Sequence, residues 1–77
     1  MKRSVITIDA KYTARQAAKL MECSGVSSLV VTSKNRLTGI LTEKDLVTRV
    51  IVKGIDPENV KVGSIMTTPV VIVKPED

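Results

Sequence analysis

Residues 25–46 read GVSSLVVTSKNRLTGILTEKDL, and this stretch decides the fold. The nearly continuous apolar run at 28–31 predicts a central strand of the sheet. A polar break at 33–36 carries turn residues and separates this run from a second one at 37–42. Because the break is short, the two strands are expected to form an antiparallel hairpin. Gly39 lies inside the second strand, where a glycine often marks the close approach of another backbone segment.

A strand and a helix are predicted before this hairpin. The β-branched run at 5–8 predicts a short strand. Thr13 and Gln16 have the spacing of a capping box, in which each side chain bonds to the backbone of the other at the start of a helix. Apolar residues follow at helical spacing as far as Gly25, which ends the helix because glycine tolerates the left-handed conformation. Since a helix joins the first two strands, these strands are predicted to be parallel.

A second helix is predicted after the hairpin, beginning at Thr42 and ending at Gly54. Its apolar stripe consists of four aliphatic residues, Leu46, Val47, Val50 and Ile51. Residues 62–66 are predicted to form one helical turn, and the aliphatic run at 70–73 predicts a further strand.

The two ends of the chain are similar to each other. Residues 1–8, MKRSVITI, align without gaps on residues 66–73, MTTPVVIV. We therefore predict two regions. Residues 1–60 form one complete unit, and residues 61–77 form a linker turn and the first strand of an incomplete second unit.

The composition excludes several kinds of chemistry. The 77 residues include no histidine and a single cysteine, Cys23, so an internal disulfide and the histidine-containing zinc sites are excluded. The sequence has no pairing of a nucleophile with a base, so we predict no enzymatic activity, no catalytic residue and no metal site. The longest aliphatic run has four residues, far below the roughly 20 of a membrane helix. We expect a cytoplasmic protein without membrane contact.

The charge pattern is mildly basic. Twelve Lys and Arg residues against eight Asp and Glu residues leave a net charge of +4, and no three consecutive residues are basic. Scattered charge of this kind is typical of a solvated surface, so binding to nucleic acid is disfavoured.

The order strand–helix–strand–strand–helix, carried by segments 25–31 and 38–46, resembles the CBS (cystathionine beta-synthase) domain. Segment 62–69, VGSIMTTP, looks like the lead-in to a second CBS motif. The resemblance implies an α+β fold, a CBS-type β-α-β-β-α unit with a small mixed three-stranded sheet packed by two helices, and an extra C-terminal strand. CBS motifs usually occur in tandem, and two of them form one module with clefts between them. This chain departs from that pattern because it lacks most of the second motif.

The resemblance implies regulation. CBS pairs bind adenosine-containing ligands such as AMP, ADP, ATP or S-adenosylmethionine and pass the signal to an attached protein. We therefore expect a regulatory module with such a ligand as its effector, no other cofactor, and a regulated partner that the sequence does not identify. Because the chain is small and has no disulfide or metal, we also expect a homodimer whose clefts lie between the two chains. Two alternatives stay open: a structural self-association domain without a functional ligand site, and weak binding to nucleic acid.

The resemblance also assigns roles to four residues. The family's aspartate that matches Asp45 bonds the ribose hydroxyls, and the residue that matches Thr42 contacts phosphate. Val26 and Ser27 match the stretch that reads the edge of the adenine, with Val26 as an apolar wall.

Three further candidates complete the expected site. Val5 and Ile6 are candidates for the opposite apolar wall, and Lys44 for a phosphate partner. From the residues alone, Thr42 and Asp45 are explained by a plain helix cap, the valines and isoleucine by burial, and Lys44 by solvation. The resemblance favours ligand binding, although an Asp45 that holds a ribose cannot also cap the helix.

Overall fold

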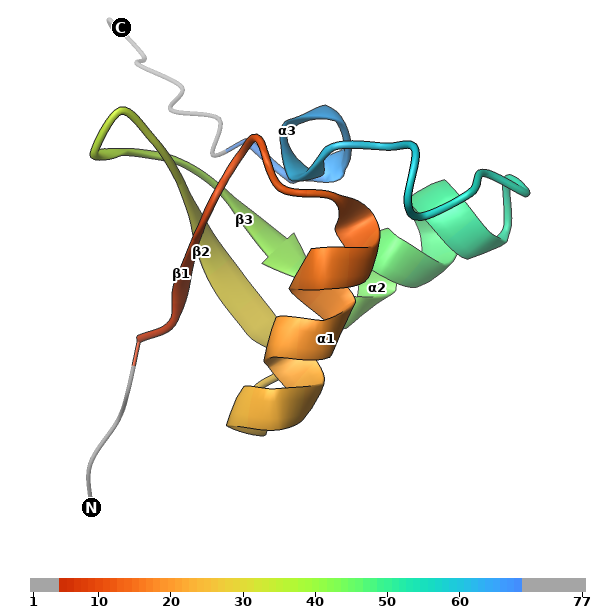
Figure 1. Ribbon diagram of the computed structural model, residues 1–77, viewed down its shortest axis with the longest axis horizontal. Coiled ribbons are helices and arrows are strands. Elements are labelled where there is room, and N and C mark those ends of the chain that lie inside the picture. The colour runs from red at the N-terminus through yellow and green to blue at the C-terminus, as the bar shows by residue number, and fades with distance from the viewer. Residues whose placement is uncertain (1–4, 69–77) are drawn as a thin grey trace, which may run out of the picture.

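The computed structural model describes residues 5–68, whose path is drawn in Figure 1. Three strands, three α-helices and one π-helical segment, η1, follow one another along this part of the chain. Their bounds are β1 Thr7–Asp9, α1 Ala14–Ser24, β2 Ser28–Ser33, β3 Arg36–Thr42, α2 Glu43–Leu46, η1 Val47–Ile51 and α3 Val62–Ile65. The predicted strand at 70–73 lies outside the described residues.

The sheet has the predicted topology. Its order is β1-β2-β3, so β2 is central, with β1 parallel and β3 antiparallel to it. The turn between β2 and β3 consists of Lys34 and Asn35, which both have a positive φ, of 55° and 66°. Two consecutive residues of this kind match the right-handed twist of a tight hairpin. The first strand was predicted at 5–8 and is found slightly later, at Thr7–Asp9.

Helix α1 begins and ends as predicted. The Thr13 Oγ1 atom accepts a hydrogen bond from the Gln16 amide (3.2 Å), and Gln16 Oε1 accepts one from the Thr13 amide (2.9 Å). Gly25 ends the helix in the left-handed conformation, with a φ of 71°. The helix buries Ala14, Ala17 and Met21. Two of these three are alanines, whose small side chains allow the helix to lie close to its neighbours.

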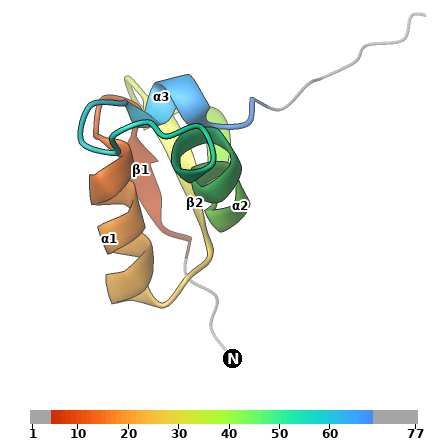
Figure 2. The ribbon, with the colours of Figure 1, turned by 90° about the vertical axis from the view of Figure 1, so that its right-hand side faces the viewer.

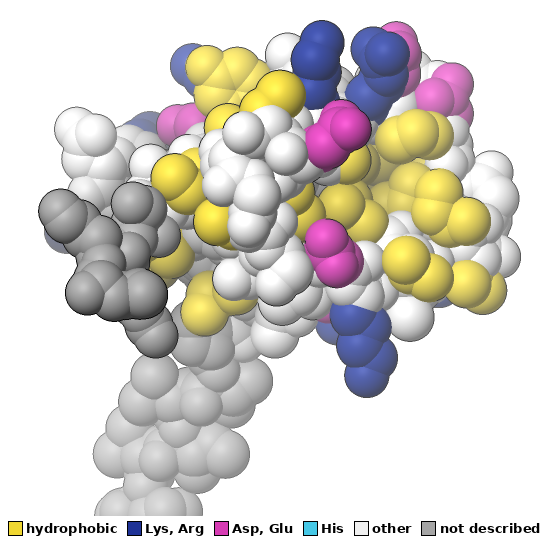
Figure 3. Space-filling model, turned by 90° about the horizontal axis from the view of Figure 1, so that it is seen from below, with side chains coloured by type: hydrophobic (Ala, Val, Ile, Leu, Met, Phe, Trp, Pro, Cys, Tyr) yellow, Lys and Arg dark blue, Asp and Glu magenta, His cyan; other side chains and the backbone are white. Residues whose placement is uncertain are grey.

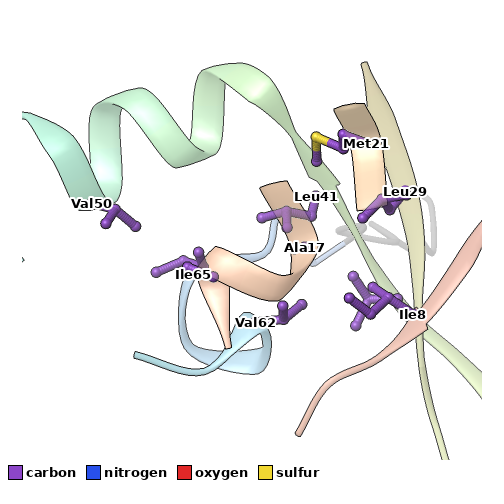
Figure 4. Packing of buried hydrophobic residues seen from close by; sticks show 10 residues of the cluster. Ile8, Ala17, Met21, Leu29, Leu41, Val50, Val62 and Ile65 are labelled. Carbon is purple, nitrogen blue, oxygen red and sulfur yellow. The ribbon is translucent and has the colours of Figure 1, made fainter. Parts of the chain in front are cut away.

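One face of the sheet is buried and the other is open. Leu29, Val31 and Leu41 are at most 1% exposed and point into a core that α1, η1 and α3 also supply (Figure 4). On the opposite face, Ile40 is 41% exposed and Val30 is only partly buried. In the side view of Figure 2, α1 lies to the left of β1 and β2, α2 lies to their right, and α3 lies above them.

Segment 60–66 folds back into the same core. Val62 and Ile65 are at most 4% exposed, and the Val62 amide donates to the Tyr12 carbonyl (2.7 Å). The Gly63 amide donates to the Ala10 carbonyl (3.0 Å), and a Cβ at this position would lie 3.2 Å from that of Ala10. The single helical turn predicted at 62–66 is therefore confirmed as α3. The boundary predicted at residue 60 stays a prediction.

The second helix differs from the prediction. Only α2 is α-helical, and it continues as η1, in which the Val52 amide donates to the Val47 carbonyl five residues earlier (2.8 Å). Val50 is 1% exposed, but Val47 and Ile51 are 51% and 64% exposed. The prediction that all four stripe residues lie on one buried face was wrong, because the core covers only the side of the helix that carries Leu46 and Val50. Figure 3 shows hydrophobic side chains gathered at the end of the molecule where η1 lies.

Candidate functional site

A reciprocal pair of hydrogen bonds caps the N-terminus of α2. Thr42 is the last residue of β3, and its Oγ1 accepts from the Asp45 amide (3.2 Å). Asp45 Oδ2 in turn accepts from the Thr42 amide (3.0 Å). The capping alternative for these two residues is thus present in the structure.

Asp45 has further partners that are distant in sequence. The Thr67 hydroxyl donates to both carboxylate oxygens, at 3.1 Å to Oδ1 and 3.3 Å to Oδ2. The Arg49 Nε atom lies 3.8 Å from Oδ1. Asp45 is only 7% exposed, and it is the one buried charged side chain among residues 5–68. Its carboxylate therefore has three protein partners: the Thr42 amide, the Thr67 hydroxyl and the Arg49 guanidinium.

Three of the predicted residues meet in one hollow on the open face of the sheet. Val5, Ile6 and Val26 line a hollow of about 200 Å³. The other lining residues come from β2 and β3: Ser28, Leu29, Val30 and Ile40. The lining is thus mostly apolar residues from three separate segments, which the fold brings together.

The hollow lies next to the capping box of α2. Ile40 lines the hollow, and Thr42 stands two residues further along the same strand, so both side chains face the same side of the sheet. Ser28, another lining residue, is the direct strand partner of Thr42. The Glu43 amide also donates to the Ser27 carbonyl (3.1 Å), which ties the start of α2 to the end of the 25–27 turn.

Four of the seven predicted residues do not line the hollow: Thr42 and Asp45 form the capping box beside it, and Ser27 and Lys44 are exposed. Ser27 stands beside the start of α2, where its carbonyl accepts from the Glu43 amide. Lys44 is exposed in the first turn of α2, and its carbonyl accepts from the Thr48 hydroxyl (2.8 Å). Neither residue lines the 200 Å³ hollow. The structure therefore brings the apolar candidates together beside the capping pair, and Ser27 and Lys44 are exposed outside the hollow.

Sequence reasoning missed Thr67. This residue belongs to a segment that pairs with the edge of β3, where the Thr67 amide donates to the Ile40 carbonyl (2.8 Å) and the Ile40 amide donates back (2.9 Å). Gly39 allows this approach, because a Cβ there would lie 2.8 Å from Met66 Sδ and 2.9 Å from the Thr67 carbonyl oxygen. The predicted close approach at Gly39 is thus confirmed. No local sequence pattern indicates that Thr67 bonds to Asp45, because the two residues are 22 positions apart in the chain.

Larger hollows lie elsewhere on the molecule. One of about 510 Å³ lies beside β1 and includes Tyr12 and Leu20, and one of about 520 Å³ includes Arg49 and Lys53. Both are wide and open, and neither contains a predicted site residue. Within residues 5–68, no three side chains of the metal-binding types are grouped together, and no helix is long and apolar enough to cross a membrane.

Comparison with known proteins shows the family. The model of the CBS domain family matches residues 1–52, so the chain belongs to the CBS domain family. An uncharacterised protein of Methanopyrus kandleri is 38% identical over 95% of this chain. The CBS domain-containing protein CBSCBSPB1 of Arabidopsis thaliana is 40% identical over 80% of it. The chain spans 38% of the length of the first relative and 12% of the second.

Solved structures share the fold. A CBS domain protein fused to a Zn-ribbon-like domain matches 91% of this chain and all of that chain, with a TM-score of 0.82 at 33% identity. A hexameric CBS-CP12 protein from bloom-forming cyanobacteria matches 99% of this chain and 46% of that chain, with a TM-score of 0.80 at 37% identity. The predicted α+β unit with a small mixed sheet is confirmed. Proteins with CBS domains are often regulatory or signal-transduction proteins.

Proposed function

We propose that this chain is a regulatory module that binds an adenosine-containing ligand in a cleft between two paired CBS motifs. AMP, ADP, ATP and S-adenosylmethionine are the candidate effectors. The observation that carries the proposal is the adjacency of the apolar hollow to the Thr42–Asp45 box on the open face of the sheet. An apolar wall beside a carboxylate and a hydroxyl suits a flat base attached to a ribose and phosphate.

The size of the hollow supports a paired arrangement. Sites for small molecules usually measure roughly 300–1,000 Å³, and this hollow has about 200 Å³. A single motif thus supplies part of a cleft, and a second motif would supply the facing wall. Val5 and Ile40 stand exposed on this face, at 71% and 41%, and would be covered by such a partner.

In this proposal each predicted residue has a role. Val26 packs against the adenine, with Val5 and Ile6 on the other side of the base. The Ser27 backbone reads the adenine edge, Thr42 and Lys44 contact phosphate, and Asp45 accepts hydrogen bonds from the ribose hydroxyls. The positive end of the helix that starts at α2 would favour the negative charge of a phosphate.

The proposed partners are a second copy of the chain, in a homodimer, and a regulated protein. The module itself carries out no reaction in this proposal, and it acts in the cytoplasm. Assembly can be measured by light scattering across a dilution series. A folded monomer at micromolar concentration, with nucleotide affinity independent of protein concentration, would contradict the paired cleft.

Self-association without a ligand is the second candidate. It is favoured by Asp45, whose carboxylate is already engaged by Thr42, Thr67 and Arg49. The exposed aliphatic residues of the open sheet face would then serve pairing alone. A dimer that does not respond to any adenosine compound would support this candidate.

A thermal-shift panel tests the proposed function. AMP, ADP, ATP, NAD and S-adenosylmethionine are each added to the full chain. A ligand at a hundred times its dissociation constant stabilises by about 2.7 kcal/mol, which shifts the melting temperature of so small a domain by about 10 °C or more. Val26→Asp should abolish the shift, because it places a charge on the wall of the hollow.

Val52→Asp is the matched control. Val52 is 72% exposed beside η1 and does not line the hollow. This variant should keep the ligand-induced shift of the wild-type chain. A panel without any shift in the wild-type chain would reject ligand sensing by this chain alone.

A further inference from the structure

The Thr67 hydroxyl bonds the 65–67 segment to the proposed ligand carboxylate. It donates to Asp45 Oδ1 at 3.1 Å and to Oδ2 at 3.3 Å. Thr67 itself is exposed, whereas Asp45 is 7% exposed. The carboxylate that is proposed to bind a ribose therefore already has an exposed hydroxyl as a partner.

The segment around Thr67 is held by the same helix that carries Asp45. The Arg49 Nη1 atom donates to the carbonyls of Ile65 (3.2 Å) and Met66 (3.1 Å). The Thr67 backbone is paired with Ile40 on the edge of β3. Asp45 and Arg49 thus fasten residues 65–67 to the domain from one side, and β3 fastens them from the other.

The hydrogen-bonding capacity of Asp45 limits what it can bind at once. A carboxylate offers about four lone-pair positions. The Thr42 amide takes one on Oδ2, and the Thr67 hydroxyl reaches both oxygens. A ribose diol needs two acceptor positions that face solvent, and Thr67 occupies that direction.

We propose that Thr67 is a latch that competes with the ligand for Asp45, so that a ribose displaces the Thr67 hydroxyl. This inference rests on the proposed function and adds its regulation. When a ligand takes Asp45, Thr67 loses its side-chain bond and the 65–67 segment is held by Arg49 and β3 alone. The state of the site thus changes how firmly residues 65–67 are held against the domain.

Thr67→Val tests the latch, because valine keeps the shape of threonine and removes the donor. A hydrogen bond to a charged group commonly accounts for about a tenfold factor in an equilibrium constant. AMP, ATP and S-adenosylmethionine should therefore bind about tenfold tighter to Thr67→Val, measured by calorimetry on the full chain. Thr68→Val is the matched control, since no hydrogen bond of the Thr68 side chain is found within residues 5–68, and it should bind like the wild-type chain.

Amide exchange gives a second readout. Adding a saturating nucleotide to the wild-type chain should speed exchange of the Thr67 amide. It should leave unchanged the exchange of the Ala10 amide, which donates to the Thr32 carbonyl away from the hollow. Without nucleotide, Thr67→Val should speed exchange at Thr67 compared with Thr68→Val. Both effects follow if the Asp45 bond keeps the segment in place.

The outcomes separate the latch from the proposed function. If the wild-type chain and Thr67→Val both fail to bind any of the three compounds, the proposed function fails, and the latch fails with it. If both bind with equal affinity, or if Thr67→Val binds more weakly and the ligand slows exchange at Thr67, then ligand sensing stands and Thr67 is no competitor. Binding by Thr67→Val alone would support both proposals.

Discussion

The domain contains two helix starts with the same local chemistry and different surroundings. At α1, Thr13 and Gln16 exchange hydrogen bonds, and at α2, Thr42 and Asp45 do the same. The first pair is neutral, and the exposed Gln16 side chain bonds only to Thr13. The second pair is charged, buried, and bonded to a residue 22 positions away.

The comparison teaches that a capping box defines a helix start and nothing more. Whether it also forms part of a site depends on what the fold places beside it. At α2 the fold adds the apolar hollow, Thr67 and Arg49. At α1 it adds an exposed ion pair between Arg15 and Glu58 (3.2 Å).

Replacing the third helical residue by alanine is expected to give the largest difference in stability between the two helix starts. This residue is Gln16 in α1 and Asp45 in α2. Asp45→Ala should lower the free energy of unfolding by about 2–4 kcal/mol, because it removes a cap and leaves the Thr42 amide and the Thr67 hydroxyl without an acceptor. Gln16→Ala should cost about 1 kcal/mol or less. Urea denaturation of both variants measures the difference, and nucleotide binding should be lost only in Asp45→Ala.

Equal losses of stability would mean that the tertiary partners of Asp45 contribute little. Unchanged nucleotide affinity in Asp45→Ala would remove this residue from the site. Asp45→Asn keeps the shape and one acceptor, so its loss of stability should be intermediate.

Substitution of Gly39 changes the surroundings of the α2 capping box and leaves its two residues, Thr42 and Asp45, in place. Gly39→Ala should cost about 1–3 kcal/mol, because the new Cβ would lie 2.8 Å from Met66 Sδ and 2.9 Å from the Thr67 carbonyl oxygen. The displaced 66–67 segment should draw the Thr67 hydroxyl away from Asp45. Thermal unfolding and the exchange rate of the Thr67 amide both report this, and a variant as stable as the wild-type chain would show that the segment adapts freely.

Substituting the two N-cap threonines, Thr13 and Thr42, should have a smaller effect on stability, and only the change at Thr42 should affect ligand binding. Thr13→Val and Thr42→Val should each cost about 1 kcal/mol, because each removes the acceptor for one helix amide. Thr42→Val should in addition weaken ATP and AMP more than adenosine, since the hydroxyl is proposed to contact phosphate. Calorimetry with the three compounds is the measurement. A uniform loss across all three would indicate a damaged helix start instead.

The smallest effect is expected at the ion pair beside the first start. Arg15 and Glu58 side chains are 64% and 60% exposed, so solvent screens their attraction. Glu58→Gln should change the free energy of unfolding by less than about 0.5 kcal/mol. A loss above 1 kcal/mol in urea denaturation would mean that this corner, where the Arg15 amide also donates to the Pro57 carbonyl, is more tightly coupled than the exposure implies.

The local elements of this domain could be read from its sequence. The capping boxes, Gly25 in the left-handed conformation and the alternation along β3 all depend on residues within four positions of each other. Their geometry follows from backbone stereochemistry, which is the same in every fold. Val5, Ile6 and Val26 were grouped through the family resemblance, and the structure places them together in one hollow.

The apolar stripe after Leu46 shows where pattern reasoning fails. Leu46 and Val50 are four residues apart and pack toward the core, whereas Val47 and Ile51, also four residues apart, are exposed on the adjacent side of the helix. The apolar pattern contains no signal for which of these two sides the core covers.

By itself the sequence determined the order of strands and helices, the start and end of α1, the parallel and antiparallel pairings, and membership of the CBS domain family. Only the tertiary structure decided that Asp45 is buried, that Thr67 donates to it, and that Gly39 makes room for the segment that carries Thr67. The physical reason is the distance along the chain. Contacts within one turn follow from local geometry, whereas a contact across 22 residues exists only once β3, α2 and α3 have packed around a common core.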